Sequence, residues 1–229
     1  MRRIVIDIET CAYPFESITD SQREYLLRYA EKEPDPEKRK AMTDEAIRFT
    51  SLYPYTAKCI AIGIFDVEKE KSFVYYENAK VEEWKSDDAK VQYKGLSEKE
   101  MLESFWRIAQ AADQVITFNG RNFDLPFLMM RSAMLQIKVT KNFMSYRYGD
   151  EHIDLLEQFT FYGATRKFNL DFYCKTFGIE SPKTAEVSGM EVKNLYDAGR
   201  IKDIAVYCLK DIYATYQLYM IWRKYLAHP

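Results

Sequence analysis

The sequence predicts a mixed α/β protein in which a central β-sheet is flanked by α-helices. Three observations support this fold class: the N-terminal segment alternates like a β-strand, two more strand-like segments follow at 57–65 and 71–77, and most of the remaining chain has helical periodicity. With 229 residues, 47% of them hydrophobic, the chain can bury one substantial core. No internal repeat or linker interrupts it, so we expect a single domain over residues 1–229.

The first strand is expected over residues 3–9, RIVIDIE. Its isoleucines face one side of the strand, whereas Asp7 and Glu9 face the other. The next segment, about 15–52, is helical in character, and its EKEPDPEKRK run combines eight charges with two prolines. We therefore expect a charged insertion of two helices around a solvated break. It could act as a lid or partner surface, or it could be a solvated decoration.

Residues 57–65 and 71–77 are separated by the short polar link DVEKE, which predicts an antiparallel hairpin. Together with the first strand, this hairpin makes a three-stranded meander. A polar stretch from Asn78 to Gly95 then leads into a helix, because Ser97 and Glu100 have the spacing of a capping box.

The second half of the chain predicts one more clear strand and several helices. The strand is QVITF, 114–118, and it is followed by a glycine-containing turn and a helix with Pro126 in its first turn. HIDLLEQF, NLDFYCKTFGI and MEVKNLYDAG are typical of short strand or helix pieces, two of them closed by glycine. A long amphipathic helix is expected from about Lys202 to Leu226.

Charge and cysteine content narrow the classes of function. The 33 basic and 35 acidic residues give a net charge of −2, so any role with nucleic acid depends on a local site rather than on a global basic field. The four cysteines form no C-x-x-C pair, which argues against a zinc site or a disulfide framework. No signal peptide is apparent, and no run approaches the roughly 18 apolar residues of a membrane span. We expect a soluble, cytoplasmic protein without membrane association.

Five polar residues are candidates for chemistry, and each has a structural alternative. Asp7 and Glu9 lie on the same strand face, roughly 6–7 Å apart along the backbone, and could share a divalent cation, or they could form the wet face of an edge strand. Asp124 follows a strand in NGRNFD and could be an ordinary N-cap. Tyr207 and Asp211 are four residues apart on the final helix and share one face, which could also be solvated.

The order of these segments resembles a known enzyme family. IDIET, NGRNFDLPFL and YCLKD occur in the order of the three motifs of DEDD exonucleases and are most similar to the proofreading exonuclease domain of family B DNA polymerases. The resemblance spans nearly the whole chain and implies a ribonuclease H-like fold and 3′-5′ exonuclease activity. Tyr207 stands four residues before the last acid, and Val206 stands where a histidine subclass has its histidine, so the resemblance implies the tyrosine subclass, DEDDy.

The resemblance also implies a set of metal ligands. Asp7 should bridge two divalent cations, Glu9 and Asp211 should complete one site, and Asp124 should hold the other, partly through water. Oxygen ligands of this kind suit Mg²⁺ or Mn²⁺. Tyr207, whose ordinary pKa is about 10, is poorly suited to act as a base at neutral pH, so we assign it to orienting the attacking water.

Further residues are expected near the substrate. Asn119 and Phe123 match positions that lie beside the terminal nucleotides in similar enzymes, although Phe123 could equally be a core residue. The backbone around Ile8 and Thr10 should approach the 3′-terminal sugar.

Two other polar features stay outside the expected site. Arg166 and Lys167 form a basic pair that could contact a phosphate, but a solvated loop explains them as well. Asp154 matches a recurrent acidic position of these domains, yet it could serve only to organise a loop or a cap. We therefore leave Asp154 out of the metal set.

The leading functional hypothesis is a 3′-5′ exonuclease that acts on the 3′ terminus of single-stranded DNA in repair or DNA processing. The sequence ends shortly after the last motif, so we expect a stand-alone protein that could work with a polymerase or repair partner in trans. One alternative is an exoribonuclease with the same mechanism, because no motif here reads the 2′-hydroxyl. Another is a catalytically silent nucleic-acid-binding module.

Overall fold

The computed structural model describes residues 1–182 and 191–227. Within these residues, seven strands form one mixed sheet in the order β4-β5-β3-β2-β1-β6-β7. The strands are β1 (Arg3–Ala12), β2 (Ala57–Asp66), β3 (Lys71–Glu77), β4 (Glu82–Lys85), β5 (Val91–Leu96), β6 (Gln114–Thr117) and β7 (His152–Asp154).

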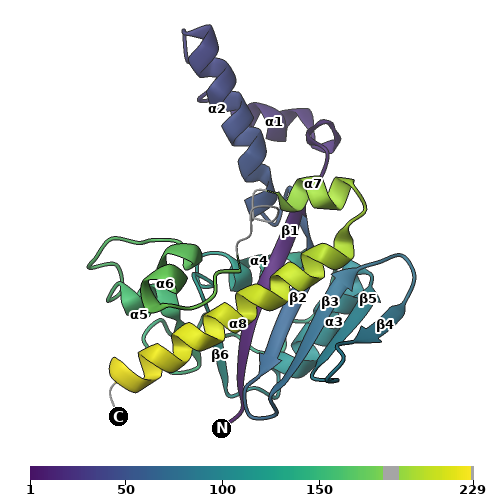
Figure 1. The fold of residues 1–229 in the computed structure, drawn as a ribbon. Helices are drawn as coiled ribbons and strands as arrows, with labels where there is room; N and C mark the ends of the chain where they lie inside the picture. The colour runs from purple at the N-terminus through teal and green to yellow at the C-terminus, as the bar shows by residue number, and fades with distance from the viewer. Residues whose placement is uncertain (183–190, 228–229) are drawn as a thin grey trace.

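Helices cover both faces of this sheet. The α-helices are α1 (Asp20–Leu27), α2 (Pro36–Phe49), α3 (Glu98–Ala109), α4 (Asp124–Met134), α5 (Leu155–Phe159), α6 (Leu170–Phe177), α7 (Val192–Asp197) and α8 (Ile201–Tyr225), and two short 3-10 helices are η1 (Phe15–Ser17) and η2 (Thr50–Leu52). Figure 1 shows α8 crossing one face of the sheet diagonally, with α3 behind the opposite face. The predicted mixed α/β architecture is confirmed.

The N-terminal meander is also confirmed. β1, β2 and β3 pair antiparallel in sequence, whereas β6 adds parallel to β1 and β7 adds parallel to β6. Because side chains alternate along a strand, the isoleucines of β1 pack with α3 and α4 in one core, while Val5 packs with α8 in the core on the other face. Asp7 and Glu9 therefore face the side of the sheet that α8 covers.

The polar stretch from Asn78 to Gly95 contains two strands that the sequence interpretation missed. β4 and β5 extend the sheet beyond β3, with β5 parallel to β3. In β5, glutamine and lysine alternate with the buried Val91 and Tyr93, and β4 is mostly charged, so the average composition resembles a loop. The edge is stabilised by Trp84, whose ring stacks on Tyr93 at 3.6 Å between centroids.

The charged insertion forms the two expected helices, α1 and α2, separated by the EKEPDP break. Figure 1 shows that both project away from the sheet, and neither contains a buried residue. Asp35 caps α2 by accepting hydrogen bonds from two backbone amides, with Pro36 as the first helical residue. The insertion returns to the body of the protein through η2, whose Thr50 is buried.

The remaining elements agree with the expected short pieces. HIDLLEQF forms β7 and α5, NLDFYCKTFGI forms α6 with Gly178 in a left-handed cap (φ 69°), and MEVKNLYDAG supplies α7. Met190, the first residue of that third segment, lies outside the described residues. In the part of the chain that the structure describes, no helix is both long enough and apolar enough to cross a bilayer.

Candidate active site

Three carboxylates from opposite ends of the chain meet on the α8 face of the sheet. Asp7 and Glu9 extend from β1, and Asp211 extends from α8. One carboxylate oxygen from each of the three lies within 4.8 Å of the others. Glu9 and Asp211 are buried, with 8% and 7% exposure, so the solvated-face alternatives for these two acids are wrong.

The close approach of α8 to the sheet depends on Gly63. This residue lies opposite Asp7 in the β1–β2 register. A Cβ atom at position 63 would come within 2.9 Å of the Cys208 Sγ and 3.2 Å of the Ile212 Cγ2. Cys208 in turn donates its S–H to the Asp7 backbone carbonyl at 3.5 Å. A glycine in β2 thus allows α8 to place Asp211 beside Asp7.

Asp124 approaches the same cluster from the first turn of α4. Its Oδ1 accepts a hydrogen bond from the Ile8 backbone N–H at 3.1 Å, and the residue is 3% exposed. Phe123 occupies the cap position of α4, so the N-cap alternative for Asp124 is wrong. The hydrogen bond fixes the Asp124 carboxylate against β1, the strand that carries Asp7 and Glu9.

The four carboxyl groups repel one another in a region with little solvent. Burial, followed by the negative charges of Asp211 and Asp124, raises the pKa of both Asp7 and Glu9 well above the usual range. Burial also raises the pKa of Asp124 and of Asp211 to about 7. A cluster of this kind is fully ionised only when cations compensate its charge. Its all-oxygen donor set fits Mg²⁺ or Mn²⁺.

Tyr207 lies one helical turn before Asp211 on α8. Its hydroxyl and the Asp211 carboxylate are close enough to shift each other's pKa. Burial, and then the charges of Asp211, Glu9 and Asp7, raise the pKa of Tyr207 far above its ordinary value. The phenol therefore stays protonated at neutral pH, where it can position a water molecule but cannot remove its proton.

A cleft of about 870 Å³ opens beside these residues. Its floor is the C-terminal part of β1, including Ile8 and Thr10, and Phe123, Tyr207 and Asp211 also line it. The end of α2 together with η2 forms one wall, and the first residues of α6 and residues of α7 also line the cleft. Three of the four residues expected near the substrate thus face this cleft.

Asn119, the fourth of these residues, is absent from the described residues that line the cleft. It adopts a left-handed conformation, φ 64°, and its side-chain oxygen accepts a hydrogen bond from Asn122 at 3.0 Å. Its backbone N–H donates to Asp154 at 2.8 Å. Substrate contact by Asn119 therefore stays a prediction.

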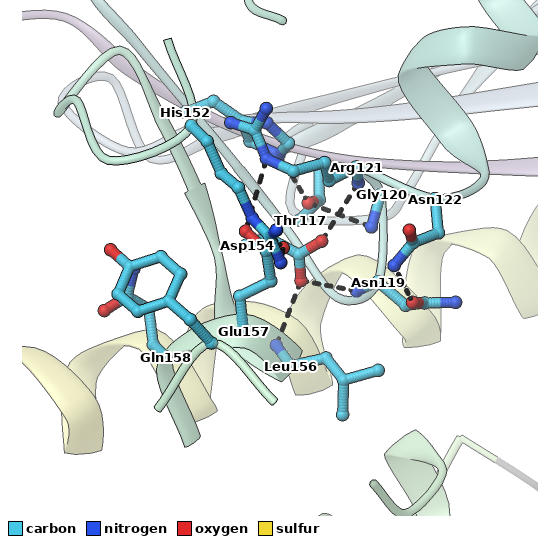
Figure 2. A network of polar contacts seen from close by, with 12 residues as sticks. Thr117, Asn119, Gly120, Arg121, Asn122, His152, Asp154, Leu156, Glu157 and Gln158 are labelled. Carbon is cyan, nitrogen blue, oxygen red and sulfur yellow. Dashed lines mark hydrogen bonds and ion pairs between the residues drawn. The ribbon is translucent and has the colours of Figure 1, made fainter. Parts of the chain in front are cut away.

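Asp154 organises the turn that precedes Asp124. Figure 2 shows its carboxylate between this turn and the start of α5, where it accepts hydrogen bonds from the backbone N–H groups of Asn119, Arg121 and Leu156 at 2.8–3.0 Å. Among the described residues, the hydrogen bonds to its carboxylate come from backbone donors. Asp154 thus organises a loop and caps α5, which is one of the two possibilities that the sequence left open. The Arg166–Lys167 pair is exposed on a loop, with Arg166 over the ring of Phe168.

Sequence reasoning missed Gly63, Arg48 and Lys193. Arg48 of α2 and Lys193 of α7 also line the cleft. A glycine inside an otherwise apolar strand is a known sign of close backbone approach, so Gly63 could have been found. No local sequence pattern marks Arg48 and Lys193 as cleft residues, because their place in the cleft depends only on the tertiary positions of α2 and α7.

Comparison with known proteins places this geometry in a family. A model of predicted 3′-5′ exonucleases related to the exonuclease domain of PolB matches residues 52–228. The DNA polymerase of Pyrococcus glycovorans is 29% identical over 168 residues, and that of Desulfurococcus sp. (strain Tok) is 30% identical over 165 residues. Each alignment covers 64% of this chain and 21% of the polymerase, so the chain spans about a fifth of the length of these relatives.

A solved structure has the same fold. The family B DNA polymerase from Pyrobaculum calidifontis matches 97% of this chain and 24% of its own chain, with a TM-score of 0.59 at 15% identity. The fold is therefore the ribonuclease H-like α/β fold that the three motifs led us to expect. With about three quarters of its length matched by the family model, the chain belongs to the family of predicted 3′-5′ exonucleases related to the exonuclease domain of PolB.

Proposed function

We propose that this protein is a metal-dependent exonuclease that removes nucleotides from the 3′ end of single-stranded DNA by a two-metal mechanism. The observation that carries the proposal is the convergence of Asp7, Glu9 and Asp211 on one point, with Asp124 fixed against the same strand. We further propose that residues 1–229 act as one exonuclease domain.

The four acids would hold two divalent cations, with Asp7 shared between them. When bound, such cations stabilise negative charge on the attacked phosphate and make a nearby water more acidic. Asp124, held by the Ile8 amide, would keep its second oxygen available for a ligand. Ile8 and Thr10 line the cleft where the terminal sugar would lie, and Phe123 would contact the terminal base.

The proposed reaction is hydrolysis of the last phosphodiester bond. A water oxygen forms a bond to phosphorus while the bond from phosphorus to the 3′-oxygen of the preceding nucleotide breaks. The products are a nucleoside 5′-monophosphate and a shortened strand with a free 3′-hydroxyl, which takes up a proton. Tyr207 would hold the attacking water through its hydroxyl, and its high pKa keeps that hydroxyl protonated throughout.

A degradation assay tests this function directly. The purified protein is incubated with 5′-labelled single-stranded DNA or RNA in Mg²⁺, Mn²⁺ or EDTA. We expect a ladder that shortens from the 3′ end of DNA, requires the metal, and is reduced by at least about 100-fold in Asp7→Ala and Asp211→Ala. Asp203→Ala is the matched control, because Asp203 is an exposed acid on the same helix, paired with Arg200.

Each other outcome has a clear meaning. Faster degradation of RNA than of DNA would identify an exoribonuclease with the same mechanism. Binding of either strand without degradation in both metals would identify a silent binding module. Full activity of the two alanine variants would show that the chemistry takes place elsewhere.

A further inference from the structure

The cleft continues beyond the carboxylates along the base of the helical insertion. The last turn of α2 and η2 form one wall of it, and α7 also contributes residues to its lining. Figure 1 shows the base of α2 and α7 near the C-terminal end of β1, and Arg48, Phe49 and Lys193 of these two helices line the cleft. The insertion is therefore part of the cleft's architecture, even though α1 and α2 bury no residue.

The two cations of this region have only weak partners within the protein. Arg48 lies 3.6 Å from Glu45, and both side chains are more than half exposed. Lys193 pairs with Asp197 one helical turn away, again at an exposed position. Exposed pairs of this kind contribute little to stability, so both cations can turn toward a phosphate at small cost. The protein's net charge is −2, so a general excess of positive charge does not explain why two cations line the same cleft.

An exposed aromatic ring lies beside one of these cations. Phe49 is 37% exposed, and the Arg48 guanidinium lies 5.3 Å from the centre of its ring. Leu52, in the same wall, is 46% exposed. A ring next to a cation is the combination by which proteins bind single-stranded nucleic acid, since bases stack on the ring while the cation neutralises phosphate.

Buried hydrogen bonds attach this wall to the strand that carries the catalytic acids. Thr10 of β1 donates its hydroxyl to the Ser51 carbonyl at 2.7 Å, and Thr56 donates to the Thr50 carbonyl at 2.7 Å. Arg131, paired with Glu98 at 2.6 Å, also donates to the Pro54 carbonyl at 3.1 Å. The wall is therefore positioned relative to Asp7 and Glu9 by structure rather than by a flexible hinge.

We propose that Arg48, Phe49 and Lys193 form a binding track for the nucleotides upstream of the 3′ terminus. The occupant is a single nucleic-acid strand, chosen because its phosphates complement the two cations and because the cleft is continuous with the carboxylate site. This inference rests on the proposed function. It assigns the insertion a role in holding substrate, where the sequence left open a lid, a partner surface or a solvated decoration.

A binding experiment tests the track without depending on catalysis. Fluorescence anisotropy with a labelled 12-nucleotide oligodeoxythymidylate in EDTA gives the Kd at several salt concentrations. We expect Phe49→Ala and Arg48→Ala each to raise the Kd about five- to tenfold. Loss of one phosphate contact in Arg48→Ala or Lys193→Ala should also reduce the slope of log Kd against log salt by about 0.7.

Two matched controls lie on the same insertion. Lys40→Ala removes a cation from α2, and Tyr25→Ala removes an exposed ring from α1, and neither residue lines the cleft. Both variants are expected to bind like the wild type. If Phe49→Ala destabilises the protein, as a lower thermal midpoint would show, Arg48→Glu and Lys193→Glu test the track instead. Both positions are exposed, so these variants should fold, and both should raise the Kd. Unchanged Kd in all cleft variants, or equal losses in the controls, would overturn the track.

Kinetics separate this inference from the proposed function. With the 12-nucleotide substrate in Mg²⁺, the cleft variants should show a KM raised at least fivefold and an unchanged kcat, whereas cleavage of a dinucleotide should not change. An equal loss on both substrates would show that the insertion only shapes the active site, and the track would be wrong. If the wild type cleaves neither substrate, the proposed function fails, and the anisotropy result still decides whether the track exists.

Discussion

The phenol of Tyr207 is largely buried near three carboxyl groups, and this environment keeps it protonated. Burial and the charges of Asp211, Glu9 and Asp7 raise its pKa far above the ordinary value. A residue that cannot ionise near neutral pH can contribute by orienting a water molecule, and its removal should lower the rate without changing the pH dependence.

At the residue scale, we therefore expect Tyr207→Phe to reduce kcat about 10- to 100-fold. The pH–rate profile should keep its shape, and Mg²⁺ affinity measured by calorimetry should remain close to that of the wild type. Tyr216→Phe is the control, because Tyr216 lies on the same helix with its ring packed against Phe65. A full kcat in Tyr207→Phe would refute the water-orienting role.

At the scale of elements, the packing of α8 on β2 sets the geometry of the site. Gly63 leaves room for Cys208 and Ile212 of α8 directly opposite Asp7. A methyl group there would push the helix outward, and Asp211 would move away from Asp7 and Glu9 with it. Metal sites tolerate only small displacements of their ligands.

We expect Gly63→Ala to lower the free energy of unfolding by about 1–3 kcal/mol and to lower activity at least tenfold in the fraction that remains folded. Gly95→Ala is the matched control, since a Cβ there would contact Asn78 and Glu82 at the far edge of the sheet. The control should lose stability but keep activity per folded molecule. If both variants keep the same specific activity, the position of α8 does not limit catalysis.

Asp154 joins three backbone donors from two elements, α5 and the turn before α4. Asp154→Ala removes a helix cap and leaves buried N–H groups unpaired, so we expect a loss of about 2–4 kcal/mol in a urea titration. Asp154→Asn should lose less, because its amide oxygen still accepts. Asp150→Ala, at an exposed neighbouring position, should be neutral. A stable Asp154→Ala variant would show that the turn is held by other contacts.

At the scale of the whole molecule, the carboxylate cluster makes stability depend on pH. In the metal-free folded protein, burial raises the pKa of Asp124 and Asp211 to about 7, whereas an unfolded chain releases these protons near pH 4. The folded state therefore binds more protons. Its extra stability is fully present below about pH 4 and is lost as the pH rises through about 7.

We accordingly expect Asp211→Asn in EDTA to be more stable than the wild type by on the order of 2 kcal/mol at pH 8. The difference should shrink at pH 5, where the wild-type carboxyls still retain protons. Added Mg²⁺ should reverse the order at pH 8, because it binds the folded wild type. Urea titrations at the two pH values measure this, and equal stabilities in EDTA at both would contradict a repulsive carboxylate cluster.

The sequence predicted the strands that have a clear apolar periodicity. It did not predict the strands whose composition resembles that of a loop. β1, β2 and β3 have alternating or continuous apolar residues, and α8 has a clear helical stripe, so these elements were predictable. β4 and β5 were not, because the edge strand β4 is mostly charged and its neighbour β5 carries glutamine and lysine, which is the composition of a loop. Short-range pattern thus identified the central strands and the flanking helices but not the extent of the sheet.

For the candidate site, spacing alone could not bring Asp7, Asp124 and Asp211 together. Each had an ordinary local explanation, and only the ordered resemblance to exonuclease motifs linked them. The resemblance could not locate Arg48 or Lys193, because their position in the cleft depends on how the insertion and α7 pack. Asn119 is the opposite case: the motif match predicted that it lies near the substrate, but it is not among the described residues that line the cleft.

The contact between Cys208 and Asp7 joins positions 201 residues apart in the chain. Its consequence concerns the order of events during synthesis. β1 is made first, but its two acids acquire their partner on α8 only after nearly all of the other elements have been translated. A nascent chain on the ribosome, surrounded by RNA, therefore lacks the completed carboxylate cluster until α8 docks.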